Sequence, residues 1–544
     1  MPMLRTSSEA FPASKKLMSD IPYVLRIGFG DLAKDVTKII GKPIACQKCG
    51  GFLMSVEQVE ENNKVGKFFH CAFCGTLNII GGEVVLAGDD GDFLIKPPPV
   101  KTETETGTIS TGGRSFLALI DVSGSMAGAN LSAVKRSLTT SIESLAANAP
   151  DTQFGLVEFE SSVLYRDLET GNEIQLPHES FPSYDNIVNA TKKLLDKIKL
   201  VHVGKNADRL KSHVASLRDQ GGTALGPAVA MASVVAKHRN VGRVVLLTDG
   251  LANEGIGALE GYQVTPAGAF YEEMGRKFLE FGTSVDVVGI ASGAGMELKT
   301  LGLLPEATGG QMYYVTPNEL DKSISELAGA SLLGRDVEVR LVTPKGVKVK
   351  DASGVSRTVI EELTKRKESK IGVVGENHEL YFEVEPEKEI KEDEVPIQVQ
   401  VTYTDEEGAR RIRAVTATLK VAKKEEEVMD TLDPTLGATF VTQKAGEESF
   451  AEGAEGRKKG RKRIAAFRSA MKEYAKAAPK PAQAKYEMVE DALRAEENEM
   501  EQLDQMMEEA PSGAPSAAAD EAFTKGLAQM RKSSKQMFEE EEEE

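Results

Sequence analysis

The sequence contains no tryptophan and only four cysteines, which all lie between Cys46 and Cys74. In a chain of 544 residues, four clustered cysteines make a poor disulfide framework, but they are typical of a metal site in a reducing compartment. The sequence also lacks any run of about 18 apolar residues, and its start, "MPMLRTSSEAFPASKKLMSD", has no apolar core of signal-peptide length. We therefore expect a cytoplasmic protein.

The chain also has fewer positively than negatively charged side chains. Lys and Arg number 66 against 84 Asp and Glu, and the formal net charge is −18. A general nucleic-acid binder needs clustered cations on an accessible face to neutralise phosphates, so we expect no nucleic-acid partner. The histidines, which form no pair with metal-ligand spacing, are His70, His178, His202, His213, His238 and His378.

Apolar residues make up 41% of the chain, which is enough for several cores. A segment rich in Pro, Thr and Gly at 96–113 predicts an exposed linker. Between residues 114 and 334, β-branched runs alternate with amphipathic segments, which predicts a doubly wound α/β domain. Period-two alternation then indicates a β-sandwich over 335–424. We expect a helical region over 425–508 and a largely disordered acidic tail over 509–544.

The four cysteines form two Cys-x-x-Cys pairs, Cys46 with Cys49 and Cys71 with Cys74, and a glycine follows each pair. This spacing predicts a zinc ribbon over 41–95, in which the four thiolates hold Zn²⁺ tetrahedrally. Because all four ligands belong to the protein, the zinc is expected to be structural. A thioredoxin-like dithiol is the weaker alternative, since no strand and helix of that kind flank either pair.

The stretch "LALIDVSGSMAGA" (117–129) is an apolar strand that ends in Asp121, Ser123 and Ser125. In a doubly wound sheet, ligands bind beyond the carboxyl ends of the strands. Two further loops are expected to reach the same edge of the sheet. They carry Thr223, at the start of a predicted helix, and Asp249, at the end of another buried strand. Five hard oxygen ligands suit Mg²⁺ or Mn²⁺, whereas the alternative is that these hydroxyls merely cap helices.

The DxSxS motif, the Gly-Gly-Thr and the strand-ending aspartate resemble the metal-ion-dependent adhesion site of a von Willebrand factor A domain. The resemblance implies that Ser123, Ser125 and Thr223 contact the metal directly, and that Asp121 and Asp249 act largely through water. It also implies that an acidic residue of a partner protein takes the open coordination position.

The order of zinc ribbon, A domain, β-sandwich and helical region resembles the COPII inner-coat family, over roughly residues 40 to 480. The subunits of that family shape secretory vesicles and bind cargo or a small GTPase, so the resemblance implies such partners and a membrane surface. The N-terminal segment, residues 1–40, looks too short for a full contribution to the coat sandwich, and no gelsolin-like domain is expected. The adhesion motif is intact here, whereas the family tends to have eroded ones.

These observations favour a non-enzymatic, metal-dependent protein-binding module or scaffold, which captures an acidic residue of a partner. The alternative is a structural protein like those of the COPII inner coat. A metal-dependent enzyme is the third class, but the three motifs contain no histidine, and we assign no catalytic residue and no organic cofactor site.

The basic segment "RKKGRKR" (457–463) has six cations in seven residues. Such a run suits a phosphoinositide surface, a nuclear signal or an acidic partner. The favoured interpretation is a surface helix neutralised by the acidic tail of the same chain, because a tethered acidic segment stays at appreciable local concentration.

Overall fold

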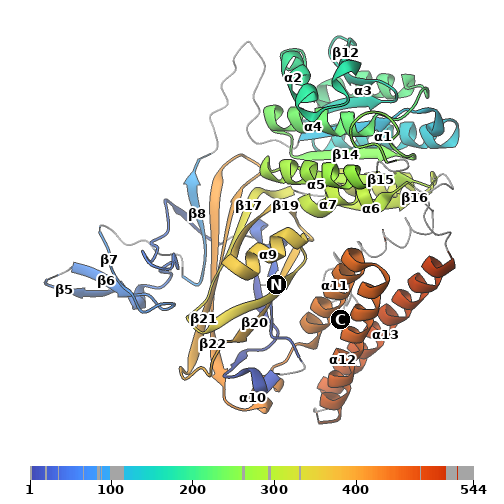
Figure 1. Cartoon of the computed structure of the whole chain (residues 1–544). Coiled ribbons are helices and arrows are strands. Elements are labelled where there is room, and N and C mark those ends of the chain that lie inside the picture. Colours follow the sequence, from blue (N-terminus) through green and yellow to red (C-terminus); the bar gives the residue numbers. More distant parts are fainter. Residues whose placement is uncertain are drawn as a thin grey trace.

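The computed structural model of the protein describes residues 3–18, 21–34, 36–64, 66–81, 86, 88–97, 115–259, 264–291, 296–329, 332–477, 480–509 and 524. The expected linker at 96–113 and acidic tail at 509–544 lie almost entirely outside these residues. Figure 1 shows an α/β domain at the top, a β-sandwich below it, a small ribbon at the left and helices at the lower right.

The α/β domain has an eight-stranded sheet with the order β12-β11-β10-β9-β14-β15-β16, and β13 pairs with β10. Its central pairs are parallel, as predicted, while β11, β12 and β13 pair antiparallel near one edge. The strands are β9 (Ser115–Asp121), β10 (Gln153–Phe159), β11 (Val163–Arg166), β12 (Glu173–Gln175), β13 (Val201–His202), β14 (Arg243–Thr248), β15 (Ser284–Ile290) and β16 (Met312–Val315).

Helices cover both faces of this sheet, because every side chain of β9 is buried and alternate residues need a cover on each side. Helices α2, α4, α5, α6 and α7 pack on the face of Leu117 and Leu119, while α1, α3 and α8 pack on the face of Phe116 and Ile120. The doubly wound fold is thereby confirmed. The helices are α1 (Ala129–Asn148), α2 (Tyr184–Leu194), α3 (Val203–Ser216), α4 (Leu225–Arg239), α5 (Val264–Glu280), α6 (Leu298–Leu301), α7 (Leu303–Thr308) and α8 (Leu320–Gly329).

The β-sandwich consists of a sheet with the order β19-β17-β21-β22-β8-β4, to which β2 adds beside β22, and a sheet with the order β1-β3-β20-β18. Apolar side chains from both sheets and from α9 form one core. The elements are β1 (Leu4–Thr6), β2 (Ala10–Pro12), β3 (Val24–Gly28), β4 (Thr37–Ile40), β8 (Asp90–Lys96), β17 (Leu332–Val342), β18 (Val347–Ser353), α9 (Arg357–Arg366), β19 (Glu368–Gly375), β20 (Glu379–Pro386), β21 (Glu394–Thr404) and β22 (Arg410–Ala422).

The N-terminal segment differs from our expectation. Residues 1–40 looked too short to contribute fully to the sandwich, yet they supply four of its strands, β1 to β4. Strand β3 is fully buried and pairs with both β1 and β20. Likewise β8, all but the last residue of which falls in the range expected for the ribbon, pairs with β22 of the sandwich. The sandwich therefore combines N-terminal strands with strands from residues 332–422, and the blue strands of Figure 1 lie among yellow and orange ones.

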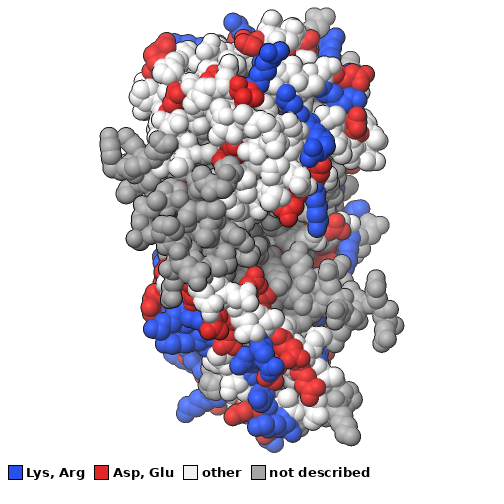
Figure 2. All heavy atoms as spheres, turned by 90° about the vertical axis from the view of Figure 1, so that its right-hand side faces the viewer, with Lys and Arg blue, Asp and Glu red and all other residues white. Residues whose placement is uncertain are grey.

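The C-terminal region is helical, as expected, and its buried side chains join Ile21, Val24 and Tyr381 of the sandwich in one cluster. No helix among the described residues is long and apolar enough to cross a membrane. On the face shown in Figure 2, Lys and Arg lie beside Asp and Glu over the lower part, where these helices lie. The helices are α10 (Glu425–Met429), α11 (Pro434–Glu452), α12 (Ala454–Ala477) and α13 (Lys480–Glu509).

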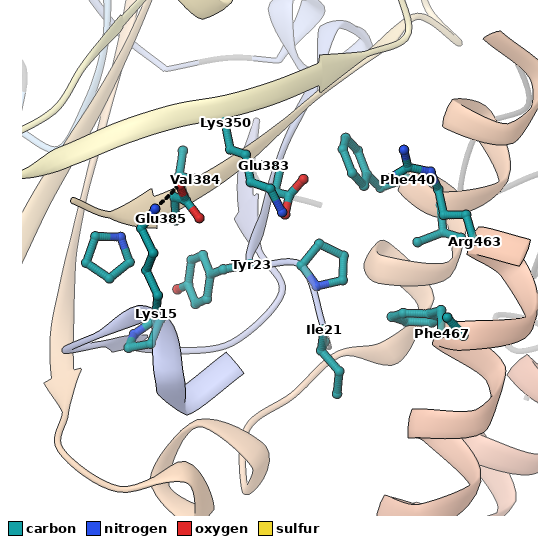
Figure 3. A pocket seen from close by; sticks show the side chains of 15 residues that line it. Lys15, Ile21, Tyr23, Lys350, Glu383, Val384, Glu385, Phe440, Arg463 and Phe467 are labelled. Carbon is teal, nitrogen blue, oxygen red and sulfur yellow. Dashed lines mark hydrogen bonds and ion pairs between the residues drawn. The ribbon is translucent and has the colours of Figure 1, made fainter. Parts of the chain in front are cut away.

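A cleft of about 400 Å³ separates these helices from the sandwich. Phe440 of α11 and Phe467 of α12 face Tyr23 of the N-terminal segment across it (Figure 3). All three rings are at most 2% exposed, so the apolar floor is already covered. At the rim, Lys350 pairs with Glu383 at 2.7 Å. The cleft thus lies along the packed boundary between the sandwich and the C-terminal helices, and the charges at its rim are largely paired.

The ribbon is a three-stranded sheet, β5 (Glu60–Asn62), β6 (Gly66–His70) and β7 (Leu77–Ile79), beside the two cysteine pairs. The glycines after the pairs have the positive φ that the chain reversal requires, +71° at Gly50 and +68° at Gly75. Each glycine N–H donates to the carbonyl of the first cysteine of its pair, at 2.9 and 2.8 Å. Two similar knuckles therefore face each other.

The four cysteine sulfurs form one cluster, in which all Sγ atoms lie within 4.8 Å of one another. Cys46 and Cys74 are 3.6 Å apart and Cys49 and Cys71 are 3.4 Å apart. Four thiolates around a tetrahedral Zn²⁺ have sulfur separations of about 3.8 Å, because the Zn–S bond is about 2.3 Å. The side chain of Asn78 donates to Cys46 Sγ from outside the cluster. The donor set and its spacing fit the structural zinc that the sequence predicts.

The ribbon is also held to the sandwich by polar contacts with its backbone. Arg340 of β17 donates to the carbonyl of Cys49 at 2.8 Å, and Gln400 of β21 donates to the carbonyl of Gly50 at 2.9 Å. A side chain at Gly50 would meet the guanidinium of Arg340 at 2.5 Å. The first knuckle is thus placed directly on the outer face of the β17–β21 pair.

We predict that Leu25→Ala lowers the stability of the sandwich by about 2–5 kcal/mol, because Leu25 is fully buried in its core. Urea unfolding followed by circular dichroism measures this change. Thr37→Ala on the exposed face of β4 is the control and should cost less than about 0.5 kcal/mol. Equal midpoints for the two variants would show that the N-terminal strands do not belong to the core.

We also predict that Cys49→Ser releases zinc and unfolds the ribbon, because metal binding supplies much of the folding free energy of such a small unit. Mass spectrometry of the metal content, on protein purified without added zinc, measures the loss. The control is His70→Ala, since His70 is exposed and outside the sulfur cluster, and this variant should keep one zinc per chain. A full complement of zinc in Cys49→Ser would remove the structural assignment.

Candidate adhesion site

The three loops singled out in the sequence lie around the middle of the α/β sheet. Strand β9 ends in Asp121 and has parallel neighbours on both sides, β10 and β14. The chain runs from β9 to β10 on one side and later returns to β14 on the other, which makes this a topological switch point. Loops diverge there and leave a crevice. Asp249 follows β14 directly, so both aspartates reach the same edge of the sheet.

The loop after β9 is organised by the carboxylate of Asp121. Its Oδ1 accepts a hydrogen bond from the backbone N–H of Ser123 at 2.8 Å. Its Oδ2 accepts from the hydroxyl of Thr248, the last residue of β14. Asp121 is fully buried, and these bonds occupy both oxygens. The carboxylate therefore ties the two central strands together where they end.

A second chain of hydrogen bonds crosses the rim of the sheet. The hydroxyls of Ser123 and Ser125 lie 3.0 Å apart, and Ser125 donates to Asp249 Oδ1 at 2.7 Å. The side-chain amide of Asn130, in the first turn of α1, donates to Asp249 Oδ2 at 2.5 Å. Ser123 and Asp249 are buried, whereas Ser125 is exposed. The site thus opens to solvent on the side of Ser125.

The loop that carries Thr223 is drawn against the first loop by its backbone. The N–H of Gly124 donates to the carbonyl of Gly221 at 3.1 Å. Gly221 has a φ of +69°, and a Cβ there would lie 2.2 Å from a carboxylate oxygen of Glu160, so glycine is required. The N–H of Thr223 donates to the side chain of Asn253 in the third loop at 2.9 Å. All three loops are therefore connected.

Burial and a neighbouring carboxylate set the electrostatics of the site. Burial raises the pKa of Asp121 to about 6, hydrogen bonds from Ser123 and Thr248 oppose this shift, and the negative charge of Asp249 adds to it. Two carboxylates and three hydroxyls are all hard oxygen donors, the kind that Mg²⁺ prefers. That these five residues hold a magnesium ion stays a prediction.

Three residues that hold the site were not singled out in the sequence. Thr248 and Asn130 bind the two aspartates, and Asn253 binds the backbone of Thr223. Short polar residues within a few positions of the predicted ligands are a weak signal: Thr248 directly precedes Asp249, whereas Asn130 and Asn253 lie five and four positions after Ser125 and Asp249. Asn253 lies in "DGLANEG", a stretch of which only Asp249 was singled out in the sequence.

Histidine comes closer to these loops than the motifs indicated. His178 Nε2 lies 3.7 Å from a carboxylate oxygen of Glu254, on the loop after β14. The His178 side chain is 72% exposed, and its ring packs against Phe181. Within the described part of the chain, the imidazole therefore meets a carboxylate that is not one of the five predicted ligands.

Comparison with known families matches two segments of the chain. Residues 114–328 match the Sec23/Sec24 trunk domain, and residues 334–422 match the Sec23/Sec24 beta-sandwich domain. These segments are the α/β domain and the C-terminal part of the sandwich described above. Together they cover more than half of the chain.

Two curated proteins are similar over most of the chain. "Circularly permutated Ras protein 1" of Dictyostelium discoideum is 24% identical over 459 residues, which cover 78% of this chain and 53% of that protein. "Protein transport protein SEC24" of Kluyveromyces lactis is 21% identical over 457 residues, which cover 76% of this chain and 47% of that protein. The chain spans about half the length of these relatives.

Among solved structures, the human COPII-coat protein Sec24c superposes with a TM-score of 0.71 at 14% sequence identity. The alignment covers 97% of this chain and 74% of Sec24c, so it includes the ribbon and the C-terminal helices that the family models leave out. The resemblance expected from the order of domains is confirmed. By its trunk, its β-sandwich and their Sec24-like arrangement, the chain belongs to the Sec23/Sec24 family.

Proposed function

We propose that the protein is a non-enzymatic scaffold of the coat type, which assembles at a membrane surface in vesicle trafficking. The observation that carries this proposal is the Sec24-like arrangement of ribbon, trunk, sandwich and helices across 97% of the chain. A scaffold needs parts that are fixed relative to one another. Here the ribbon is hydrogen-bonded to the sandwich, and the helices share a buried cluster with it.

A small GTPase is the protein partner that we propose for this scaffold. One of the curated relatives is named as a Ras protein, and Ras proteins are small GTPases. The chain matches about half of that relative, which leaves the other half of its length for further parts. We infer that the framework shared by the two proteins works together with a small GTPase.

We predict that liposomes rich in acidic lipids sediment the protein several-fold more efficiently when an activated small GTPase is present. The GTPases are taken from the same organism and loaded with a non-hydrolysable GTP analogue. GDP-loaded GTPases serve as the control, because they lack the γ-phosphate that orders switch segments. Protein that remains in the supernatant with every GTPase tested would contradict the coat-type assignment.

The converging adhesion loops favour a second function on the same scaffold. We propose that Asp121, Ser123, Ser125, Thr223 and Asp249 bind Mg²⁺ and that an acidic residue of a partner completes the coordination. Three linked loops, hard oxygen donors and an exposed Ser125 support this proposal. A carboxylate is the natural ligand for the open position of such an ion.

We predict that Ser125→Ala lowers Mg²⁺ affinity by at least about tenfold without unfolding the domain, because Ser125 is exposed and its loss opens no cavity. Calorimetric titration of Mg²⁺ gives the affinity, and Ser132→Ala on the exposed side of α1 is the matched control. Pull-down from lysate in the presence of Mg²⁺ or of EDTA then tests whether binding of the partner depends on the metal. Equal Mg²⁺ binding by both variants, or none by the wild type, would overturn the adhesion proposal while leaving the coat proposal standing.

A further inference from the structure

The basic segment of the sequence lies in α12 and forms one wall of a groove of about 570 Å³. Lys458, Arg461, Lys462 and Arg468 of α12 line it, together with Arg494 of α13. The carboxylates in the lining are Glu497 and Glu501, and Ala465 is its only apolar residue. Cations therefore outnumber anions in this groove, although the chain as a whole carries a formal net charge of −18.

Three of these five cations are already paired. Arg461 pairs with Asp504 at 2.9 Å, Arg468 with Glu497 at 2.6 Å and Arg494 with Glu490 at 3.1 Å. Lys458 and Lys462 are exposed, and within the described part of the chain no carboxylate pairs with either. They are four residues apart, so both ammonium groups lie on one face of the helix. The groove thus presents two adjacent positive charges for an anionic ligand.

The sequence itself contains a segment of matching charge. Glu539 to Glu544 are six consecutive glutamates, and only 29 residues, 510–538, separate them from the end of α13 at Glu509. A chain of 29 residues reaches at most roughly 100 Å. The ion pair between Arg457 and Asp504 places the last turns of α13 beside the start of α12. The groove is therefore well within reach of the glutamates.

We propose that the acidic run Glu539–Glu544 occupies the groove between α12 and α13 and pairs with Lys458 and Lys462. The contact is intramolecular, so the tether holds the acidic run at an effective concentration on the order of millimolar. With little apolar surface in the groove, attraction between charges drives the contact, and salt weakens it. This proposal stands independently of the coat and adhesion functions.

The test uses a fluorescent peptide of residues 533–544 as a probe added in trans. The full chain is compared with a variant in which Glu539 to Glu544 are each changed to Gln. Two further variants carry the neutral tail together with either Lys458→Gln and Lys462→Gln, or Lys472→Gln and Lys476→Gln. The second pair is the matched control: two exposed lysines of α12, also four residues apart, that do not line the groove.

Fluorescence anisotropy at low salt should show the peptide binding the neutral-tail protein at least about tenfold more tightly than the full chain, which is the effect of removing a tethered competitor. The substitutions at Lys458 and Lys462 should abolish binding of the peptide. The substitutions at Lys472 and Lys476 should change its affinity by no more than about twofold. All variants should have the same melting temperature. Equal binding to the full chain and the neutral-tail protein would overturn the proposal. Peptide binding that is unchanged by the substitutions at Lys458 and Lys462 would also overturn it. The same holds if the neutral-tail protein binds acidic liposomes but does not bind the peptide.

Discussion

Strand β22 is the element around which the distant parts of the chain are joined. It pairs with β21 over its length, with β8 on its other side and with β2 near its end. Arg413 of β22 is 2% exposed and holds Asp90 of β8 through two hydrogen bonds, at 2.6 and 2.9 Å. The guanidinium is buried, although the Asp90 side chain is 37% exposed, and loss of a paired carboxylate from a buried cation is destabilising. This pair therefore favours β8 as the neighbour of β22. The ribbon between β4 and β8 is positioned by the same pairing.

The parts of the fold that the sequence predicts are those with local signals. The alternation of buried strands and amphipathic helices indicated the α/β domain, because each strand is covered on both faces and therefore reads as a continuous apolar run. The cysteine spacing indicated the ribbon for a similar reason, since one knuckle is complete within five residues. Neither prediction depends on contacts between distant parts of the chain.

The N-terminal strands could not be predicted in this way. Strands β1 and β2 have three residues each, too few to show an alternation, and their partners lie far along the chain. Strand β2 pairs with residues 420–422, more than 400 positions later. The adhesion loops show the same limit on a smaller scale: the five predicted ligands were visible as motifs, whereas Thr248 and Asn253 matter only because folding brings their partners to them.

Charge and apolar packing have separate roles in the C-terminal helices. The cations of the basic segment meet carboxylates of both neighbouring helices, as when Arg463 pairs with Glu448 of α11 and Arg461 with Asp504 of α13. Such partly exposed pairs contribute about 0–1 kcal/mol each, so they orient α12 more than they stabilise it. The stability comes from the buried faces, where Ile464 of α12 and Leu493 of α13 are fully covered. Because packing holds the helices together, charges on the outer face of α12 are free to serve binding without loss of the fold.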